Sequence, residues 1–234
     1  MPDVTQPSAQ LHASHIYKSW GTQVIYHDFS VSFPEGQITS ILGPSGCGKT
    51  TLLNILDGSH IPERGEIQDF LNKRISVIFQ DPCLLPWMST LANIEFVLLD
   101  QFNKRKSRSL ALEYLEMMGL VEFQSYYPSQ LSGGMKQRVA MARAFAFPSE
   151  IILMDEPFRA MDVKLKDNLI VEFLKLWRKD KRTVIFVTHD INEALKLGSL
   201  IYVFSKPEVM IAGVFKNNEI ADKAELTSKI IELL

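Results

Sequence analysis

The sequence predicts an α/β fold, in which helices cover a largely parallel sheet that also carries an antiparallel β flank and a helical insertion. Short, continuously apolar segments rich in β-branched residues alternate with helical patterns, and helical periodicity takes over in the middle of the chain. The 234 residues, 46% hydrophobic and 22% charged, match ordinary globular composition and suffice for one large domain or two small ones. We therefore expect a sizeable folded core.

The expected strands of the core recur along the chain. Strands buried on both faces of a parallel sheet show continuous rather than alternating apolar residues. The segments with this pattern are Ile38–Leu42, Ile75–Phe79, Ile151–Met154, Val184–Val187 and Leu200–Phe204. Val24–Val31 alternates more and is bounded by Pro34-Glu35-Gly36, so it predicts an antiparallel edge piece.

The middle of the chain predicts helices that are inserted into the α/β core. We expect one domain over residues 1–234, with the core and its β flank in 1–80 and 148–234 and the helical subdomain in 81–147. Apolar residues recur at three- and four-residue intervals in Leu91–Leu99, Ser109–Met118 and Gly134–Phe147. The tail Asn217–Leu234 predicts one or two terminal helices that pack on the protein rather than bind a membrane.

Charge and cysteine content disfavour several classes of protein. The net charge of −2 speaks against a nucleic-acid partner, and the basic run Lys104–Arg108 is typical of a solvated helix start. Cys47 and Cys83 do not form a disulfide framework, and the N-terminus lacks a secretory pattern, so we expect a cytoplasmic protein. No apolar run approaches the ~18–20 residues that span a bilayer, so any membrane role must act through a partner.

A glycine-rich segment fits the phosphate-loop pattern G-x-x-x-x-G-K-S/T between the strand Ile38–Leu42 and the helical run Thr51–Leu56. Glycines let consecutive backbone N–H groups curl around a phosphate at the positive end of a helix. We expect Lys49 to reach the β- and γ-phosphates of ATP and Thr50 to hold Mg²⁺. The predicted nucleotide-binding residues here are Gly43, Pro44, Ser45, Gly46, Cys47, Gly48, Lys49, Thr50 and Thr51.

This loop makes the predicted fold class a P-loop NTPase (RecA-like) core with an antiparallel β subdomain and an inserted helical subdomain. Cys47 lies inside the loop, where a small side chain fits between phosphate-facing amides. Phosphoryl transfer requires no thiol, so we interpret Cys47 as structural filler rather than as a catalytic nucleophile.

Two carboxylates follow the strand Ile151–Met154, at the strand edge where α/β sheets bind ligands. In a phosphate-loop enzyme Asp155 would contact Mg²⁺ through water, and Glu156 would polarise the attacking water. Gln80 follows another strand and could give the metal an oxygen or orient water, although a lone glutamine there is usually a capping or surface residue. His189 closes the strand Thr183–Thr188 and could touch the γ-phosphate, although a lone histidine is more often a packing residue.

Leu131–Arg138 reads LSGGMKQR and resembles the signature sequence of ATP-binding-cassette ATPases. Ser132 and the amides of Gly133 and Gly134, at a helix start, would form a second anion site, while the simpler interpretation is a serine N-cap. Because one chain already has its phosphate loop, the second site makes sense mainly if it serves another subunit. The resemblance implies this arrangement, with two ATP molecules held between two head-to-tail copies of the chain.

The resemblance covers roughly residues 11 to 205. It implies that Trp20 stacks on adenine, that Gln80 belongs to the glutamine loop, that Asp162 belongs to the inter-subunit loop, and that His189 is the switch histidine. The segment Arg159-Ala160-Met161 departs from the family, in which a small residue and leucine are more usual before the aspartate. This departure puts the fine geometry of communication between the two copies in doubt.

A narrower resemblance lies in Leu84, Leu85, Pro86 and Trp87, and in Met135 within the signature. These residues are similar to those of ATPases in the nitrate, sulfonate, taurine and bicarbonate importer group. The resemblance implies transmembrane permease subunits that dock on the apolar segment, a periplasmic or extracellular solute-binding protein that acts indirectly, and a peripheral location on the cytoplasmic face of the membrane. The alternative interpretation of this segment is local core of the helical insertion.

Two other functions stay open at the level of sequence. A soluble cassette ATPase for iron–sulfur cluster assembly or DNA repair would share the motifs, but repair-type members usually carry long coiled-coil or zinc insertions, which this chain lacks. A small-molecule kinase would share the phosphate loop but would have no reason to possess Leu131–Arg138. The function that the sequence favours is the ATP-hydrolysing subunit of a transporter for a small, possibly anionic, solute.

Overall fold

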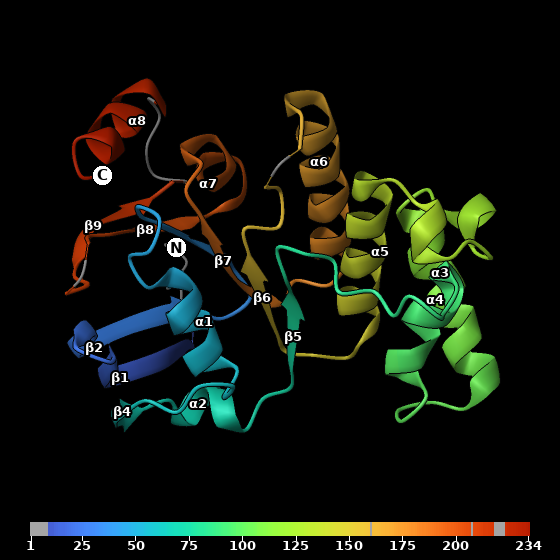
Figure 1. Ribbon diagram of the computed structural model, residues 1–234. Coiled ribbons are helices and arrows are strands. Elements are labelled where there is room, and N and C mark those ends of the chain that lie inside the picture. Colours follow the sequence, from blue (N-terminus) through green and yellow to red (C-terminus); the bar gives the residue numbers. More distant parts are fainter. Residues whose placement is uncertain (1–8, 160, 207, 218–222) are drawn as a thin grey trace, which may run out of the picture. The chain divides into compact units, whose positions relative to one another are not determined.

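The computed structural model describes residues 9–159, 161–206, 208–217 and 223–234, and these fall into two units (Figure 1). The first unit comprises Met1–Ile75 and Arg182–Leu234, and the second comprises Ser76–Lys181. The second unit is thus an insertion in the sequence of the first. The predicted domain limits, residues 1–80, 81–147 and 148–234, stay a prediction.

The first unit contains a parallel core of buried strands. β3 (Ile38–Leu42) lies between β7 (Thr183–Thr188) and β8 (Leu200–Phe204) and runs parallel to both, while β9 (Ile211–Lys216) pairs antiparallel with β8. Every residue of β3 and β7 is buried, including the threonines and the serine among their apolar residues, as expected for strands with both faces covered. The predicted bounds of β3 and β8 are confirmed, and β7 matches the predicted strand Thr183–Thr188, whose apolar run is Val184–Val187.

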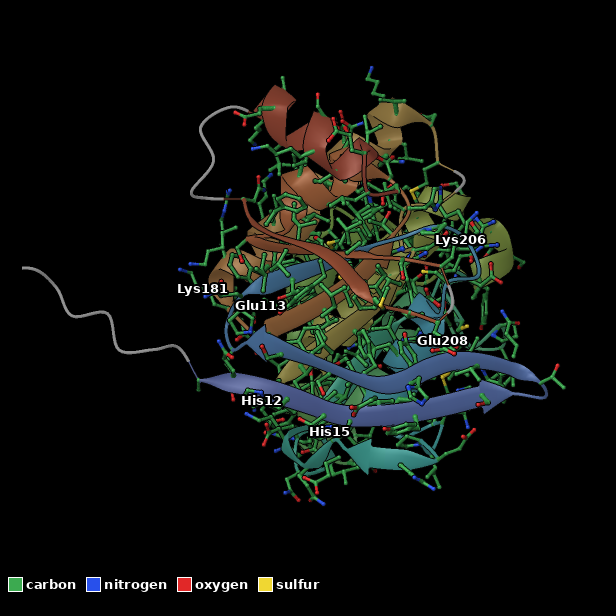
Figure 2. The ribbon with its side chains drawn as sticks, turned by 90° about the vertical axis from the view of Figure 1, so that its left-hand side faces the viewer. His12, His15, Glu113, Lys181, Lys206 and Glu208 are labelled. Carbon is green, nitrogen blue, oxygen red and sulfur yellow. The ribbon has the colours of Figure 1, made fainter. Side chains whose placement is uncertain are left out.

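An antiparallel sheet forms the β flank of the first unit. Its order is β2 (Gln23–Pro34), β1 (Gln10–Trp20) and β4 (Arg64–Glu66), so the predicted edge piece Val24–Val31 is confirmed as part of β2. β1 bears the side chains of His12 and His15 (Figure 2). At His15 the β1–β2 register shifts, and the His15 Nδ1 atom lies 2.7 Å from Oδ1 of Asp28.

The described part of the first unit also contains the helices α1 (Lys49–Leu56), α2 (Gln68–Leu71), α7 (Ile191–Leu197) and α8 (Lys223–Ile231). Leu226 and Ile230 of α8 are fully buried in a cluster that also contains residues of β3, α7 and β8. The prediction that the tail packs on the protein is therefore confirmed for residues 223–231. Residues 218–222 of the predicted tail lie outside the described residues.

The second unit is mainly helical. Two neighbouring strands, β5 (Ile75–Ile78) and β6 (Ile151–Asp155), accompany α3 (Thr90–Glu95), η1 (Phe96–Leu98), α4 (Lys104–Met117), η2 (Val121–Phe123), η3 (Pro128–Gln130), α5 (Gly133–Ala146) and α6 (Val163–Lys179). α3 and α4 pack on α5, which also contacts α6 (Figure 1). The three predicted helices are confirmed within a few residues, and the basic run Lys104–Arg108 is the largely exposed start of α4.

None of the helices in the described part of the chain is both long and apolar enough to cross a membrane.

Candidate functional site

The predicted phosphate loop connects the end of β3 to the start of α1 in the first unit. Gly46 and Gly48 have φ angles of 76° and 110°, a region that residues with a Cβ rarely occupy. A Cβ on Gly48 would lie 2.7 Å from Cγ2 of Ile25, and one on Gly43 would lie 2.8 Å from Sγ of Cys47. Both backbone shape and close packing therefore demand glycine here, which leaves the loop amides open to an anion.

Lys49 is folded against this loop and is only 5% exposed. Its Nζ donates hydrogen bonds to the carbonyl oxygens of Gly43 at 2.7 Å and Pro44 at 3.0 Å. The loop is also held from β2, because the Tyr26 hydroxyl donates to the carbonyl of Gly48 at 2.9 Å. Burial raises the pKa of Tyr26 well above its ordinary value, so its hydroxyl stays a donor near neutral pH. The loop thus places one positive charge at the expected phosphate position.

Cys47 lies beneath the loop and is 1% exposed. Burial raises the pKa of its thiol, and the neighbouring Lys49 ammonium counters part of that rise. The thiolate, which is the nucleophilic form of cysteine, is therefore disfavoured at neutral pH. This environment suits the structural role that the sequence predicts for Cys47.

His189 lies at the same sheet edge as the phosphate loop. Leu42 and Thr188 are paired in the parallel register of β3 and β7, so the next residues, Gly43 and His189, follow neighbouring strands about 4.8 Å apart. The turn at His189 is fixed on its far side, because the Thr188 hydroxyl donates to the buried Glu193 carboxylate at 2.6 Å and accepts from the Asp190 amide at 3.0 Å. The structure thus places His189 directly after the strand that neighbours the one leading into the phosphate loop.

Trp20 ends β1 with 47% of its surface exposed. Its ring meets the His60 ring edge to face at a centroid distance of 5.1 Å, and Nζ of Lys18 lies 4.7 Å from the centre of the Trp20 ring. A half-exposed indole that neighbouring side chains hold in place can offer a flat surface to a base, as adenine stacking requires.

The second unit contains a hollow of about 370 Å³ that is lined by most of the remaining predicted residues. Lining residues include Gln80, Ser132, Gly133, Gly134, Arg159 and Asp162. Two helices begin here. Oγ of Ser132 accepts from the Met135 amide at 3.3 Å to cap α5, and Oδ1 of Asp162 accepts from the Leu165 amide at 2.9 Å to cap α6. The positive ends of two helix dipoles therefore line one hollow.

The interpretation of Ser132 as a helix N-cap is confirmed. The second anion site stays a prediction, and the position of Ser132 on a concave surface at a helix start is compatible with it. Gly134 is fixed by packing, since a Cβ there would lie 2.9 Å from Cδ2 of Leu165. A larger residue at position 134 would push α5 and α6 apart at the hollow.

Glu156 follows Asp155 at the end of β6 and has a φ of 41°, in the left-handed region. Such a conformation costs a non-glycine residue roughly 1–3 kcal/mol and is found mostly at functional sites. Nη1 of Arg159 lies 3.4 Å from Oε2 of Glu156 and donates to Oε1 of Gln80 at 3.1 Å. The structure therefore gathers two predicted catalytic residues, Gln80 and Glu156, around an arginine that sequence reasoning noted only as a departure.

Comparison with known proteins identifies the family to which the chain belongs. A family model described as ABC transporter matches residues 26–159. The chain belongs to the ABC transporter family. It is the ATP-binding domain of such a transporter, an ATPase with an α/β P-loop NTPase fold.

Three similar proteins illustrate the match. An uncharacterized ABC transporter ATP-binding protein of Methanocaldococcus jannaschii is 42% identical over 73% of this chain and 67% of its own length. The taurine import ATP-binding protein TauB of Escherichia coli O157:H7 is 37% identical over 83% of this chain and 79% of its own. A solved dimeric ATP-binding cassette in a post-hydrolysis state, bound to ADP and Pi, is 32% identical with a TM-score of 0.74, over 88% of this chain and all of that one.

The apolar segment Leu84–Trp87 of this ABC transporter ATPase is presented to solvent. Trp87 is 70% exposed, and Pro86 is exposed as well, whereas Leu84 and Leu85 are half-buried. An exposed Trp87 does not fit the interpretation of the whole segment as local core. The segment combines a partly buried base with an exposed aromatic tip.

Two side chains that sequence reasoning missed hold the backbone at this segment. Asn93 is fully buried; its Oδ1 accepts from the Leu85 amide at 2.8 Å, and its Nδ2 donates to the carbonyls of Leu85, Met88 and Ser89 at 3.1–3.2 Å. Arg143 donates to the carbonyls of Cys83 at 2.9 Å and Pro82 at 3.0 Å. The available signal was a polar residue within a segment that predicts a helix, because such a residue is normally hydrogen-bonded where it is buried, as Asn93 is.

Proposed function

We propose that the chain energises the import of a small, possibly anionic, solute through separate transmembrane permease subunits. In this proposal two identical copies close head to tail around two ATP molecules. The observation that carries it is the hollow around Ser132, where two helices begin, in a chain that already has a phosphate loop. A solved relative that is a dimeric cassette bound to ADP and Pi supports the pairing of two copies.

Each predicted side chain has one task in this proposal. Trp20 stacks on adenine, and the phosphate-loop amides and Lys49 bind the β- and γ-phosphates. Glu156 accepts a proton from the attacking water while His189 holds that water and contacts the γ-phosphate. Ser132, Gly133 and Gly134 complete the phosphate contacts of the partner copy, and Asp162 lies in the segment that joins the two copies.

Mg²⁺ would be held by Thr50, Gln80 and Asp155 together with the phosphates, and would neutralise charge on them. A hydroxyl, an amide and a carboxylate supply the oxygen atoms that Mg²⁺ prefers, and this ion usually binds through few protein ligands, phosphates and water.

Import is supported by the taurine import relative and by the exposed segment Leu84–Trp87. A permease helix that lies on this segment would cover the Trp87 ring, and interfaces are enriched in such aromatic anchors. The chain would then work at the cytoplasmic face of the membrane, and a periplasmic or extracellular solute-binding protein would reach it only through the permease.

Replacing Ser132 with alanine tests the site shared between two copies. We expect kcat for ATP hydrolysis to fall about 10- to 100-fold while the Kd of the isolated chain for ATP stays within about twofold, because Ser132 would bind the partner's nucleotide. Turnover and titration calorimetry measure the two quantities. Loss of ATP affinity in the isolated chain would place Ser132 in the chain's own nucleotide site and contradict the proposal.

Ser89→Ala is the matched control for this test. Ser89 caps α3 with the geometry that Ser132 has on α5, since its Oγ accepts from the Ala92 amide at 3.3 Å. Both variants lose a helix cap, worth roughly 1 kcal/mol of stability. Only Ser132→Ala should lose turnover, so an equal loss in both would assign the effect to helix stability.

Replacing Trp87 with alanine tests the permease surface. A tagged chain purified from detergent-solubilised membranes of its own host should retain a membrane protein, and Trp87→Ala should lose at least about nine-tenths of it, because one buried anchor can supply over 2 kcal/mol. Leu71→Ala, which removes an exposed apolar side chain from α2, is the control. If the wild-type chain retains no membrane protein, the result contradicts the transport function and favours a soluble cassette ATPase for iron–sulfur cluster assembly.

A further inference from the structure

Arg159 contacts the two side-chain oxygens that the proposed chemistry needs. Its Nη1 donates to Oε1 of Gln80 at 3.1 Å and lies 3.4 Å from Oε2 of Glu156. Oε1 of Gln80 is the atom proposed to serve the metal or the water, and a carboxylate oxygen of Glu156 must accept the proton of the attacking water. A guanidinium between them engages both at once.

The local fold delivers Arg159 to this position. The Arg159 amide donates to the Glu156 carbonyl at 3.1 Å, which closes a four-residue turn with Pro157 at its second position, where proline is favoured. Phe158 is fully buried and anchors the turn in the unit. The side chain of Arg159 therefore folds back over the carboxylate that starts the turn.

The two partners differ in their exposure to solvent. The Glu156 side chain is 13% exposed, whereas that of Arg159 is 52% exposed. A carboxylate with little water around it interacts more strongly with a nearby cation than an exposed one does. The half-exposed guanidinium regains its hydration when it leaves, so the contact can open and close.

We propose that Arg159 is a positioning residue that restrains hydrolysis by holding Gln80 and Glu156 in an inactive arrangement. Glu156 accepts a proton from water only while the guanidinium is away from it, so turnover scales with the fraction of time that the contact is open. This inference rests on the proposed function. In this inference Arg159, which departs from the family pattern, forms an autoinhibitory contact. A small residue at the same position could not form it.

Replacing Arg159 with alanine in the full chain tests the restraint. We expect kcat for ATP hydrolysis to rise about threefold to tenfold, with KM for ATP within about twofold, because the contact involves neither the phosphate loop nor Trp20. Arg159→Lys, which keeps the charge but cannot bridge two oxygens as a planar guanidinium does, should fall between the wild type and Arg159→Ala. A kcat in Arg159→Ala equal to or below that of the wild type overturns the proposal.

Arg108→Ala is the matched control. Arg108 Nη1 lies 3.4 Å from Oε1 of Glu95, with side-chain exposures of 57% and 20%, so this pair has nearly the geometry of Arg159 and Glu156 without touching a predicted site residue. The kcat of Arg108→Ala should equal that of the wild type. If Arg108→Ala raises kcat as much as Arg159→Ala does, the effect comes from the loss of any such ion pair and the restraint is refuted.

The dependence of kcat on salt concentration separates a charge-based restraint from a purely structural role of Arg159, because a structural role would not depend on salt. Salt screens a half-exposed ion pair, so the ratio of the Arg159→Ala kcat to the wild-type kcat should shrink between 50 mM and 500 mM salt. A ratio that does not change with salt contradicts a charge-based restraint. If Glu156→Gln hydrolyses ATP at the wild-type rate, the proposed function itself fails, whereas turnover lost in Glu156→Gln but unchanged in Arg159→Ala refutes the restraint alone.

Discussion

Replacing Glu156 with glutamine is expected to lower the rate of ATP hydrolysis by about 10²- to 10⁴-fold, the usual effect of removing a general base. Glutamine has nearly the same shape as glutamate but cannot accept the proton of the attacking water. The φ of 41° at this position has to accommodate a side chain of nearly the same size in both proteins, so the substitution adds little new strain. Phosphate release from ATP, followed with saturating substrate, measures the effect.

ATP should still bind to the Glu156→Gln variant and should hold two copies together for longer than in the wild type, because the nucleotide is no longer consumed. Size-exclusion chromatography with ATP would show a dimer peak that ADP does not produce. Glu66→Gln, at an exposed position of β4, is the control and should keep the wild-type rate within about twofold. Unchanged turnover in Glu156→Gln would remove Glu156 from its proposed role.

Replacing Lys49 with alanine should raise the Kd for ATP about 10²- to 10³-fold. Hydrogen bonds to charged groups contribute about 1.5–3 kcal/mol each, and the ammonium would make at least two to the phosphates. In the structure Nζ of Lys49 already lies at the loop, bonded to the carbonyls of Gly43 and Pro44, so little reorganisation is needed to bind phosphate. Titration calorimetry with ATP measures the change.

The same substitution also removes two hydrogen bonds from the loop itself, so thermal unfolding of Lys49→Ala should be recorded beside the binding data. Lys106→Ala, which removes an exposed lysine from the first turn of α4, controls for the loss of one positive charge. If Lys49→Ala remains folded and binds ATP as tightly as the wild type, the loop is not the nucleotide site.

The buried parallel strands could be predicted because most of their residues are apolar, with only the small side chains of Thr39 and Ser40 between the apolar residues of β3, and the bounds of β3 and β8 were correct. β1 was missed because its alternation breaks at the bulge near His15, and β9 because it is a half-exposed edge strand. α6 was not predicted, although Asp162 as its N-cap and buried residues at helical spacing, such as Leu169 and Phe173, carried the signal.

The candidate site also contains residues that the sequence identified and residues that it did not. The motifs identified residues whose roles follow from local sequence, such as the glycines of the phosphate loop and the serine that begins α5. Arg159, Asn93, Arg143 and Tyr26 were not assigned roles, because each acts through a contact with residues that are distant or otherwise unmarked in sequence. Gln80 and Arg159, for example, are 79 positions apart, and no periodicity connects them.

The way in which the segment Leu84–Trp87 is anchored makes the shape of its backbone independent of the side chain at its tip. Asn93 and Arg143 form hydrogen bonds with backbone carbonyl and amide groups, and these bonds involve no side chain of the segment itself. The shape of the loop is therefore independent of the identity of its tip. A substitution at position 87 should therefore alter the surface that the segment offers to the proposed membrane partner while the backbone beneath it keeps its shape.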